Sequence, residues 1–487
     1  MAATVAVLST VVASTTWALN QESIPRIEAS SPAWTEWDTQ FKHELGDDSW
    51  PFHGIAALRI DGVVHLWAGG GPGQQDVLMR LGAKELEVVA RLGEGPSFGA
   101  QSIDLDGDDD TDLLVAREDG LVVYWNEDGQ LVEEGQGVGC ETGTPFNVAV
   151  ADVNGDGFAD IHIACFVGFE DFRSGVFNDP AHVAPNRLLL GAEDGWTDAT
   201  ADYQLAGTQN SFLSAFVDLD LDGRPDLVVA NNTGRIELYH NDGGQYSLFG
   251  FEGHGYWMGL AIGDLDADGD QDLVFSNVGS SIPAPLLKGD LTDEQSLEPR
   301  WMVIWNDGAR RYRAQPLSGL GFGWGVAAGD VDSDGDLDLV ATQNYRKWPL
   351  HHLLPLSGKT LLWDGEAYAS ADLGLSNPLF GQSPLFVDLD QDGLEDVVMS
   401  NPGSVLRAFR NPGDPTRAVT VRLQDTLENQ GTRVTARMAD GHTATWAVTG
   451  GGFMSDGLAD RVVVLPEGAE RVLIERPGEL PQTVELP

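Results

Sequence analysis

The sequence predicts an all-β protein in which a seven-bladed β-propeller is followed by a small C-terminal β domain. Three observations support this fold class: an acidic pattern that occurs six times, a short β-branched run after each copy, and Asp-Gly turns further downstream. The copies begin 46 to 66 residues apart. Such a period is typical of propellers and solenoids, in which each unit buries its faces against its neighbours.

The acidic pattern reads Asp-x-Asp/Asn-x-Asp-Gly-x-x-Asp. We call each copy an acid loop and number its residues as positions one to nine. In the first acid loop, Asp109 stands at position six, where the other loops have glycine. Positions one, three, five and nine are the candidate metal ligands: Asp104, Asp106, Asp108 and Asp112; Asp152, Asn154, Asp156 and Asp160; Asp218, Asp220, Asp222 and Asp226; Asp264, Asp266, Asp268 and Asp272; Asp330, Asp332, Asp334 and Asp338; Asp388, Asp390, Asp392 and Asp396.

Carboxylates crowded into one short loop favour a bound cation. Each close pair repels by about 4 kcal/mol at an effective dielectric near 20, and a divalent ion removes this cost. Ca²⁺ accepts six to eight oxygens in flexible geometry, whereas Mg²⁺ requires an octahedron and keeps several waters. We therefore expect about six calcium ions, one in each acid loop. The alternatives are sodium or manganese, or solvated acidic turns without metal.

The acid loop resembles the start of an EF-hand, but its surroundings differ. An EF-hand needs glutamate at position twelve and flanking helices. Position twelve is instead occupied by residues without a ligating side chain: Val115, Ile163, Val229, Phe275, Ala341 and Met399. The segments after the loops are short and β-branched, so each acid loop is expected to join two strands of a hairpin.

A second repeated element completes each blade. Downstream of five acid loops, an apolar strand is followed by an Asp-Gly turn, which is the strongest short hairpin signal. Each blade thus has four strands. Residues 52–92 show the same rhythm with the acid loop shortened to Asp61-Gly62, so they are expected to form a first blade without metal. The last blade lacks its outer hairpin, and residues 31–37 are expected to close the ring by pairing with it.

These motifs resemble the FG-GAP/VCBS calcium-loop repeats of integrin α heads and bacterial surface proteins. The tail resembles the UnbV/ASPIC domain of the cartilage-acidic-protein-like family, on the stretches 429–434, 450–455 and 476–478. Thr432 replaces the alanine of that family, and its tryptophan near the end is missing. The resemblance implies an extracellular, calcium-stabilised binding protein. The expected organisation is a possible signal peptide at 1–18, the propeller at 24–414 and the UnbV/ASPIC-like domain at 415–487.

The composition limits the kinds of partner and the cellular locations that we expect for this protein. The formal net charge is -48, from 76 acidic and 28 basic residues, which excludes nucleic acid as a partner. No stretch reaches the length of a transmembrane helix, so we expect no membrane insertion. We also expect a monomer. Residues 1–18 resemble a secretory signal without its basic start, or else a disordered start. The expected location is secreted, periplasmic or at the cell surface.

The two cysteines bracket one hairpin. Cys140 and Cys165 are close enough to form a disulfide in an oxidising compartment, and two buried thiols are the alternative.

Three links between the second and third strands of a blade are long: residues 166–187, 278–300 and 344–360. They are expected on the face opposite the acid loops. Aromatic and basic residues gather in them, which suggests a site for a sugar or an anionic glycan. The candidate ligand residues are Arg173, Tyr345, Arg346, Lys347, Trp348 and His351. The alternative is that these side chains only pack the links and balance charge.

Before each acid loop, one residue stands six positions ahead of the first aspartate: Phe98, Phe146, Phe212, Met258, Trp324 and Gln382. They either pack between blades or line the mouth of the central channel.

The sequence supports three hypotheses of function. The first is a non-catalytic extracellular module that binds calcium and recognises a glycan or an extracellular protein, as in adhesion. The second is a carbohydrate-active enzyme of the polysaccharide-lyase kind on a calcium-loop propeller, by analogy of fold. The third is a structural surface protein. No catalytic residue is assigned.

Overall fold

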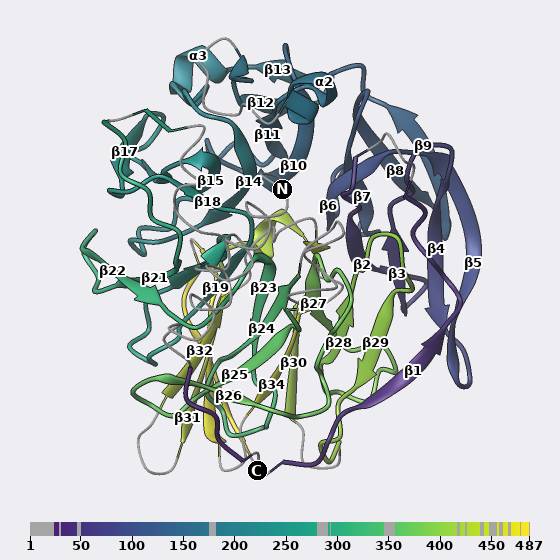
Figure 1. Cartoon of the computed structure of the whole chain (residues 1–487), viewed down its shortest axis with the longest axis vertical. Coiled ribbons are helices and arrows are strands. Elements are labelled where there is room, and N and C mark those ends of the chain that lie inside the picture. The colour runs from purple at the N-terminus through teal and green to yellow at the C-terminus, as the bar shows by residue number, and fades with distance from the viewer. Residues whose placement is uncertain are drawn as a thin grey trace, which may run out of the picture.

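The computed structural model describes residues 24–28, 31–45, 50–174, 182–279, 291–292, 294–344, 356–415, 419–423, 426–438, 443–447, 455–456, 461–465, 469–477 and 479–486. Strands dominate it (Figure 1), which confirms the predicted all-β class. The short helices are α2 (Phe169–Ser174), α3 (Thr200–Tyr203) and the 3-10 turn η4 (Leu427–Asn429). None of the helices in the described ranges has the length and hydropathy needed to cross a membrane.

Five sheets contain a four-stranded antiparallel meander, in which neighbouring strands are consecutive in the chain. Their strands are β6 (Ser97–Ile103), β7 (Asp112–Arg117), β8 (Gly120–Glu127) and β9 (Gln130–Gly135); β10 (Thr144–Ala151), β11 (Asp160–Phe166), β12 (Arg187–Ala192) and β13 (Gly195–Asp198); β14 (Ser211–Val217), β15 (Asp226–Gly234), β16 (Ile236–Asn241) and β17 (Tyr246–Gly250); β19 (Leu260–Gly263), β20 (Asp272–Phe275), β21 (Trp301–Asn306) and β22 (Tyr312–Leu317); β23 (Gly323–Gly329), β24 (Asp338–Gln343), β25 (Lys359–Trp363) and β26 (Tyr368–Ala371). The short strand β18 (Gly255–Tyr256) pairs with β15.

A nine-stranded sheet joins the two ends of this series. Its order is β27 (Pro384–Val387), β28 (Asp396–Met399), β29 (Arg407–Arg410), β1 (Thr35–Thr39), β5 (Glu85–Glu94), β4 (Gln75–Leu81), β3 (Val63–Ala68), β2 (Ile55–Ile60) and β33 (Ser455–Asp456). The strand β1 pairs antiparallel with β29 and parallel with β5. It therefore links a meander from the beginning of the chain to a three-stranded meander from much later.

Burial follows the order of strands within each sheet. The first strands β6, β10 and β14 are buried at every residue, whereas the last strands β9 and β17 are mostly exposed. The first strands thus face the middle of the molecule, and the sheets follow one another around it in chain order (Figure 1). Strands buried on both faces are mostly apolar, and the few polar residues in them, such as Gln101 and Asn147, bond to the backbone of the neighbouring sheet.

Aromatic side chains fill the centre of the ring at one end. Phe52 lies 5.2 Å from Phe146, 5.4 Å from Phe212 and 5.6 Å from Trp324, measured between ring centroids. These three residues belong to different sheets, so Phe52 contacts several sheets at once. We call this group the aromatic plug. All six residues that precede the acid loops at equal distance are buried, so they pack in the core and do not line an open channel.

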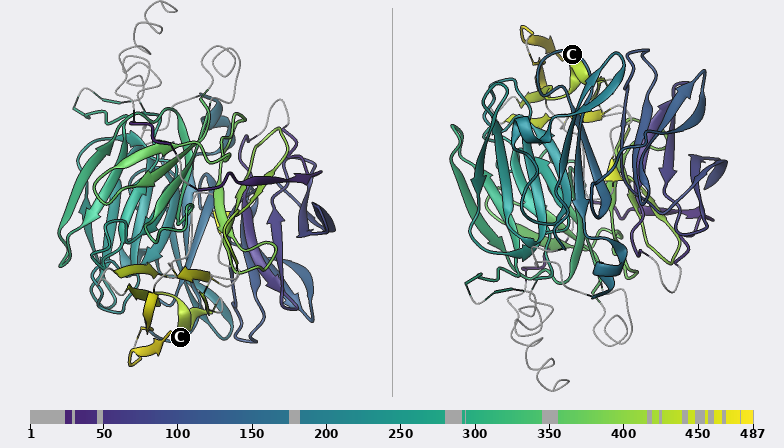
Figure 2. Two further views of the ribbon diagram at one scale, coloured as in Figure 1. Left: turned by 90° about the horizontal axis from the view of Figure 1, so that it is seen from below. Right: turned by 90° about the horizontal axis from the view of Figure 1, so that it is seen from above.

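The C-terminal strands lie at the opposite end of the ring from α2 (Figure 2). They form a pair, β30 (Val419–Leu423) with β34 (Arg461–Leu465), and a sheet of β32 (Thr443–Ala447), β31 (Arg433–Met438), β35 (Ala469–Glu475) and β36 (Gln482–Glu485). The strand β33 pairs in parallel with β2, the first strand of its meander, and contacts β6 and β27. A C-terminal segment thus reaches the centre of the ring.

Cys140 and Cys165 form a disulfide, with their Cα atoms 5.9 Å apart. Of the two alternatives left open by the sequence, the structure has the bridged one. It joins the segment before β10 to β11, so it ties the start of one meander to the end of its second strand.

Two stacked histidines lie where the first and last meanders meet. The rings of His43 and His53 are 4.7 Å apart, and both are fully buried. The backbone N–H of His43 donates to the carbonyl of Ser404, and the N–H of His53 donates to Oε1 of Gln382. Neither ring nitrogen of His43 has a hydrogen-bond partner in the described part of the chain. Burial, followed by the charge of His53, lowers the pKa of His43 well below its usual value.

We expect acid to destabilise the protein through His43. As pH falls through about 6.5, the unfolded chain takes up a proton on this imidazole and the folded protein does not, so stability present above that pH is lost below it. The variant His43→Leu should reduce the dependence of the unfolding free energy on pH between 7 and 5 by up to about 1.4 kcal/mol per pH unit. Urea unfolding at both pH values measures this. Phe41→Leu, which alters a neighbouring ring 4.9 Å away, should leave the pH dependence unchanged.

Candidate metal centres

Each acid loop connects the first and second strands of a meander. Position nine is the first residue of the second strand in all six cases, as Asp112 shows at the start of β7 and Asp396 at the start of β28. The loops therefore occupy the hairpins in which the sequence placed them. They lie at the end of the ring that carries the C-terminal strands, because Arg433 of β31 donates from Nη1 to the carbonyl of Gly269 at 3.1 Å.

The carboxylate at position nine is held by two backbone N–H groups. Asp272 accepts from Leu265 at position two and from Asn306 at the end of the third strand, at 2.9 and 2.8 Å. The same pair of bonds recurs at Asp112, Asp160, Asp226, Asp338 and Asp396. This aspartate therefore fixes the loop to both neighbouring strands.

The other carboxylates shape the loop itself. Position one accepts the N–H of position six, as in Asp330 with Gly335 at 3.0 Å. Position five accepts the N–H of position seven, as in Asp334 with Asp336 at 3.0 Å. Backbone N–H groups that donate to a carboxylate favour its ionised form, so these contacts offset part of the cost of placing negative charge in the loop.

Two positions of every loop adopt a left-handed backbone. Position six does so, and Asp109 with φ 72° takes the conformation that glycine has in the other loops. Position four is also left-handed, although in four loops it is not glycine: Leu221, Ala267, Ser333 and Gln391, with φ between 56° and 64°. An L-residue costs about 1–2 kcal/mol in this region. The geometry that brings the side-chain ligands together is thus maintained against a backbone cost.

Side chains of the same loop converge. One oxygen from each of Asp104, Asp106 and Asp108 lies within 4.8 Å of the others, and the same holds for the trios Asp218, Asp220, Asp222; Asp264, Asp266, Asp272; and Asp330, Asp332, Asp338. Oxygens at this spacing could all contact one hard cation of the size of calcium.

Burial makes ionisation of these carboxylates costly. It raises the pKa of Asp272 and of Asp330 to about 8, and the carboxylates of Asp334 and Asp332 add to the shift at Asp330. Burial also raises the pKa of Asp112 and of Asp160 to about 7. At neutral pH such groups resist losing their protons unless a positive charge is supplied nearby.

Some loop oxygens are buried without any hydrogen bond. Oδ1 of Asp264 and of Asp332 has no partner in the described part of the chain. A buried carboxylate oxygen without a partner is expensive, and a bound cation would satisfy it. Together with the converging oxygens, these atoms fit calcium, the ion that takes oxygen ligands from carboxylates and backbone carbonyls.

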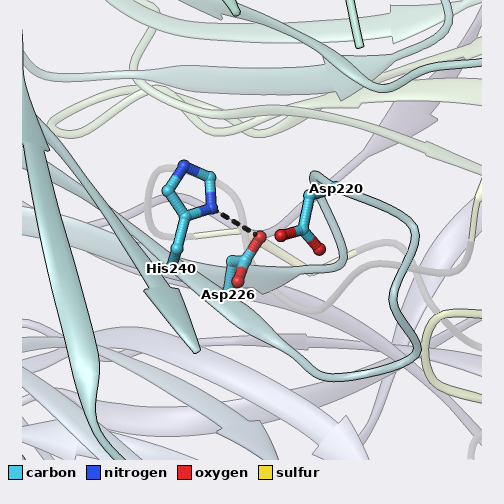
Figure 3. A group of neighbouring side chains, drawn as sticks. All are labelled: Asp220, Asp226 and His240. Carbon is cyan, nitrogen blue, oxygen red and sulfur yellow. Dashed lines mark hydrogen bonds and ion pairs between the residues drawn. The ribbon is translucent and has the colours of Figure 1, made fainter. Parts of the chain in front are cut away.

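A histidine that the sequence pattern did not indicate lies beside the acid loop at 218–226 (Figure 3). Nδ1 of His240, at the end of β16, lies 3.1 Å from Oδ2 of Asp226, and its Nε2 lies 3.1 Å from the hydroxyl of Tyr312. Asp220, Asp226 and His240 form a further group whose ligand atoms lie within 4.8 Å. Sequence spacing could not reveal this contact with Tyr312, because that residue belongs to the next sheet along the chain.

The candidate glycan residues are not brought together by the described structure. Tyr345, Arg346, Lys347, Trp348 and His351 lie outside the described residues. Arg173 belongs to α2, in the link between β11 and β12. The clustering of these residues therefore remains a prediction.

Comparison with protein families identifies FG-GAP-like repeats at residues 104–163 and 218–275. Each match begins at one acid loop and ends within the strand that follows the next, so the two matches together cover the loops that begin at 104, 152, 218 and 264. The fold and the loops thus define an all-β protein that contains FG-GAP-like repeats. A search among curated proteins finds no match.

Solved structures resemble the chain only distantly. A crystal structure of BBS1N in complex with ARL6DN, soaked with mercury, has a TM-score of 0.48 and 9% identity, and the match covers 79% of this chain and 98% of the other. The same complex soaked with lead gives a TM-score of 0.49 at 9% identity and the same coverage. A complex of S. cerevisiae Dbp5 with Nup159, Gle1, IP6 and ADP gives 0.43 at 11% identity, covering 80% of this chain and 98% of that one. Nothing about function is carried over at these similarities.

Proposed function

We propose that the protein is a calcium-stabilised, seven-bladed β-propeller that acts as a non-catalytic binding module outside the cytoplasm. Five blades are the meanders β6–β9, β10–β13, β14–β17, β19–β22 and β23–β26. The other two are β2–β5 and β27–β29 completed by β1, which share the nine-stranded sheet. Pairing of β1 with both β29 and β5 leaves no free edge between the first and last blades, as a closed ring requires.

Calcium is the central part of this proposal, and one observation carries it. The acid loops gather buried carboxylates with raised pKa, and some of their oxygens have no hydrogen-bond partner in the described structure. The side chains at positions one, three, five and nine would hold the ion together with the carbonyl of position seven. Bound calcium would supply a rigid positive centre for each loop that holds it.

The ligand-binding face in this proposal is the end of the ring opposite the C-terminal domain. That domain covers part of the acid-loop end: a cavity of about 230 Å³ there is walled by Asp152 and Asp218 of two acid loops and by Glu428 and Pro477 of the C-terminal region. The link that contains α2 lies at the other end (Figure 2). Phe169 and Phe172 of α2 pack on the aromatic plug, which gives this link a firm base. A module that recognises a glycan or a protein would use the three long links there.

An extracellular setting is supported by the disulfide, because such bonds persist in oxidising compartments and are rare in the cytosol. The strongly acidic composition adds solubility and argues against nucleic acid as a partner. The finer family assignment that we propose is the UnbV/ASPIC group, on the resemblance of the C-terminal segment.

Two variants test the division of roles between the faces. Replacing Arg346, Lys347 and Trp348 with alanine should abolish binding on a glycan array and leave the melting temperature nearly unchanged. Replacing Asp334 and Asp338 with asparagine should lower the melting temperature in calcium and leave binding intact in the fraction that folds. If the triple variant binds like the parent, or if the parent cleaves uronic-acid polymers, the proposed binding role is wrong.

A further inference from the structure

In two of the six acid loops, arginine side chains form ion pairs with the candidate ligand carboxylates. In the loop at 218–226, Nε of Arg310 lies 2.5 Å from Oδ2 of Asp220, and the guanidinium of Arg224 pairs with Asp222. Arg310 comes from the turn between β21 and β22 of the next blade, and its Nη1 also binds Asp242 at 2.7 Å. Positions three and five of this loop are therefore both paired with arginine.

The loop at 388–396 has the same property with different residues. Arg410, the last residue of β29, places Nε 2.9 Å from Oδ2 of Asp390 and Nη2 3.1 Å from Oδ2 of Asp392. One guanidinium thus bridges positions three and five. A second one, from Arg422 of β30, lies 3.8 Å from Oδ2 of Asp388 at position one.

In the other four acid loops the candidate ligand carboxylates lack such partners in the described part of the chain, and Arg433 meets the loop at 264–272 only at the backbone carbonyl of Gly269. Within the described ranges, no arginine or lysine forms an ion pair with positions one, three, five or nine of the loops that begin at 104, 152, 264 and 330. The two groups of loops differ in the positive charge beside their carboxylates. Each of the two arginine-paired loops combines four carboxylates with two guanidiniums, and two guanidiniums carry the charge of one calcium ion.

We propose that the loops at 218–226 and 388–396 are compensated by their own arginines, so that calcium binding is confined to the other four. This inference rests on the proposed function, because it sorts the metal sites of that proposal into two classes. A metal that entered a compensated loop would have to displace guanidiniums from the carboxylates of positions three and five. It would thereby gain less electrostatic energy than in a loop without a cation.

The arrangement also differs in where the positive charge is anchored. Calcium is supplied by solvent, whereas Arg310 belongs to the neighbouring blade and Arg422 to the C-terminal domain. The compensated loops therefore bind parts of the same chain to each other. The loop at 388–396 lies in the blade that β1 completes, and Thr35 of β1 is paired directly with Arg410. The blade that closes the ring would keep its loop in order without metal.

Counting bound calcium tests the inference directly. Native mass spectrometry of the intact chain in calcium should find one ion for each loop without arginine and none for the other two. The variants Arg310→Gln and Arg410→Gln should each gain one ion per chain. Arg407→Gln is the matched control, since Arg407 lies on the same strand as Arg410 but pairs with Glu36 and should gain none. A parent that fills all six loops, or arginine variants that gain no ion, overturns the inference.

A second experiment separates this inference from the proposed function. Asp332 and Asp390 both stand at position three, the first without arginine and the second paired with Arg410. In chelator, Asp390→Asn should lower the melting temperature, because it removes the partner of Arg410, whereas Asp332→Asn should raise it by removing a crowded carboxylate. In calcium, Asp332→Asn should lower the melting temperature. Asp390→Asn should lower the melting temperature by the same amount in calcium as in chelator.

The two arms fail in different ways. If the chelator arm shows Asp390→Asn and Asp332→Asn shifting the melting temperature in the same direction, the arginines do not compensate their loops. If Asp332→Asn shifts the melting temperature equally in calcium and in chelator, the proposed calcium binding is wrong. The role of Arg410 is then still decided by the measurements in chelator alone.

Discussion

Removing calcium with a chelator is expected to lower the melting temperature by about 10 °C or more. At a calcium concentration 100 times the dissociation constant, each independent site stabilises the folded protein by about 2.7 kcal/mol. Several sites together approach the whole free energy of unfolding of an ordinary domain, which is about 5–15 kcal/mol. The physical reason is that, once the metal is lost, buried carboxylates such as Asp330 and Asp272 must either take up a proton or carry a charge without a nearby cation, and both states cost free energy at neutral pH.

Differential scanning calorimetry with excess calcium, with magnesium and with chelator measures this effect. Magnesium should restore only a small part of the lost stability, because it prefers an octahedron with several waters. Identical melting temperatures in calcium and in chelator would contradict calcium binding by the acid loops.

Deletion of residues 24–41 is expected to prevent the formation of a soluble, cooperatively unfolding protein. The deletion removes β1, so β29 loses one of its two antiparallel partners and β5 loses its parallel partner. It also removes Trp34, which is buried and donates from Nε1 to the carbonyl of Val331 at 3.3 Å. Two exposed strand edges are templates for aggregation. Size-exclusion chromatography and urea unfolding measure the outcome.

A milder change at the same place serves as the control. Glu36 forms a bidentate pair with Arg407, with both distances 2.7 Å, and this pair lies near the surface. Glu36→Gln should therefore cost about 1 kcal/mol or less. If the deleted protein is as soluble and as stable as the parent, β1 does not close the ring. If Glu36→Gln alone causes aggregation, the ion pair matters more than the strand.

The local geometry of the acid loops was predictable because it is encoded within nine residues. Position nine begins the second strand in every loop, where the spacing placed it, and glycine at position six marks the left-handed turn. The all-β class followed from the β-branched runs for the same reason. Position four was not predictable: Leu221 and Gln391 adopt a left-handed backbone without any residue preference that would indicate it.

Contacts between distant parts of the chain were beyond the sequence. Arg310 reaches Asp220 across 90 positions, and Phe52 joins the aromatic plug although it precedes the first strand of its own meander. The parallel pairing of β33 with β2 had no signal either, because two residues give no periodicity. Such contacts depend on how blades lie in space, and a repeat pattern reports only what happens inside each blade.

The pairing of β1 with β29 also delays one step of folding while the chain is being synthesised. Glu36 and Arg407 are 371 positions apart. At a synthesis rate of about 5–20 residues per second, β1 must wait roughly 20 to 75 seconds for its partner to be made. A hairpin inside one blade, by contrast, forms in about 1–10 μs once its strands exist. The sequence of β1 suits this delay: Thr35, Glu36, Asp38 and Thr39 are polar, so the unpaired strand stays soluble until the last blade arrives.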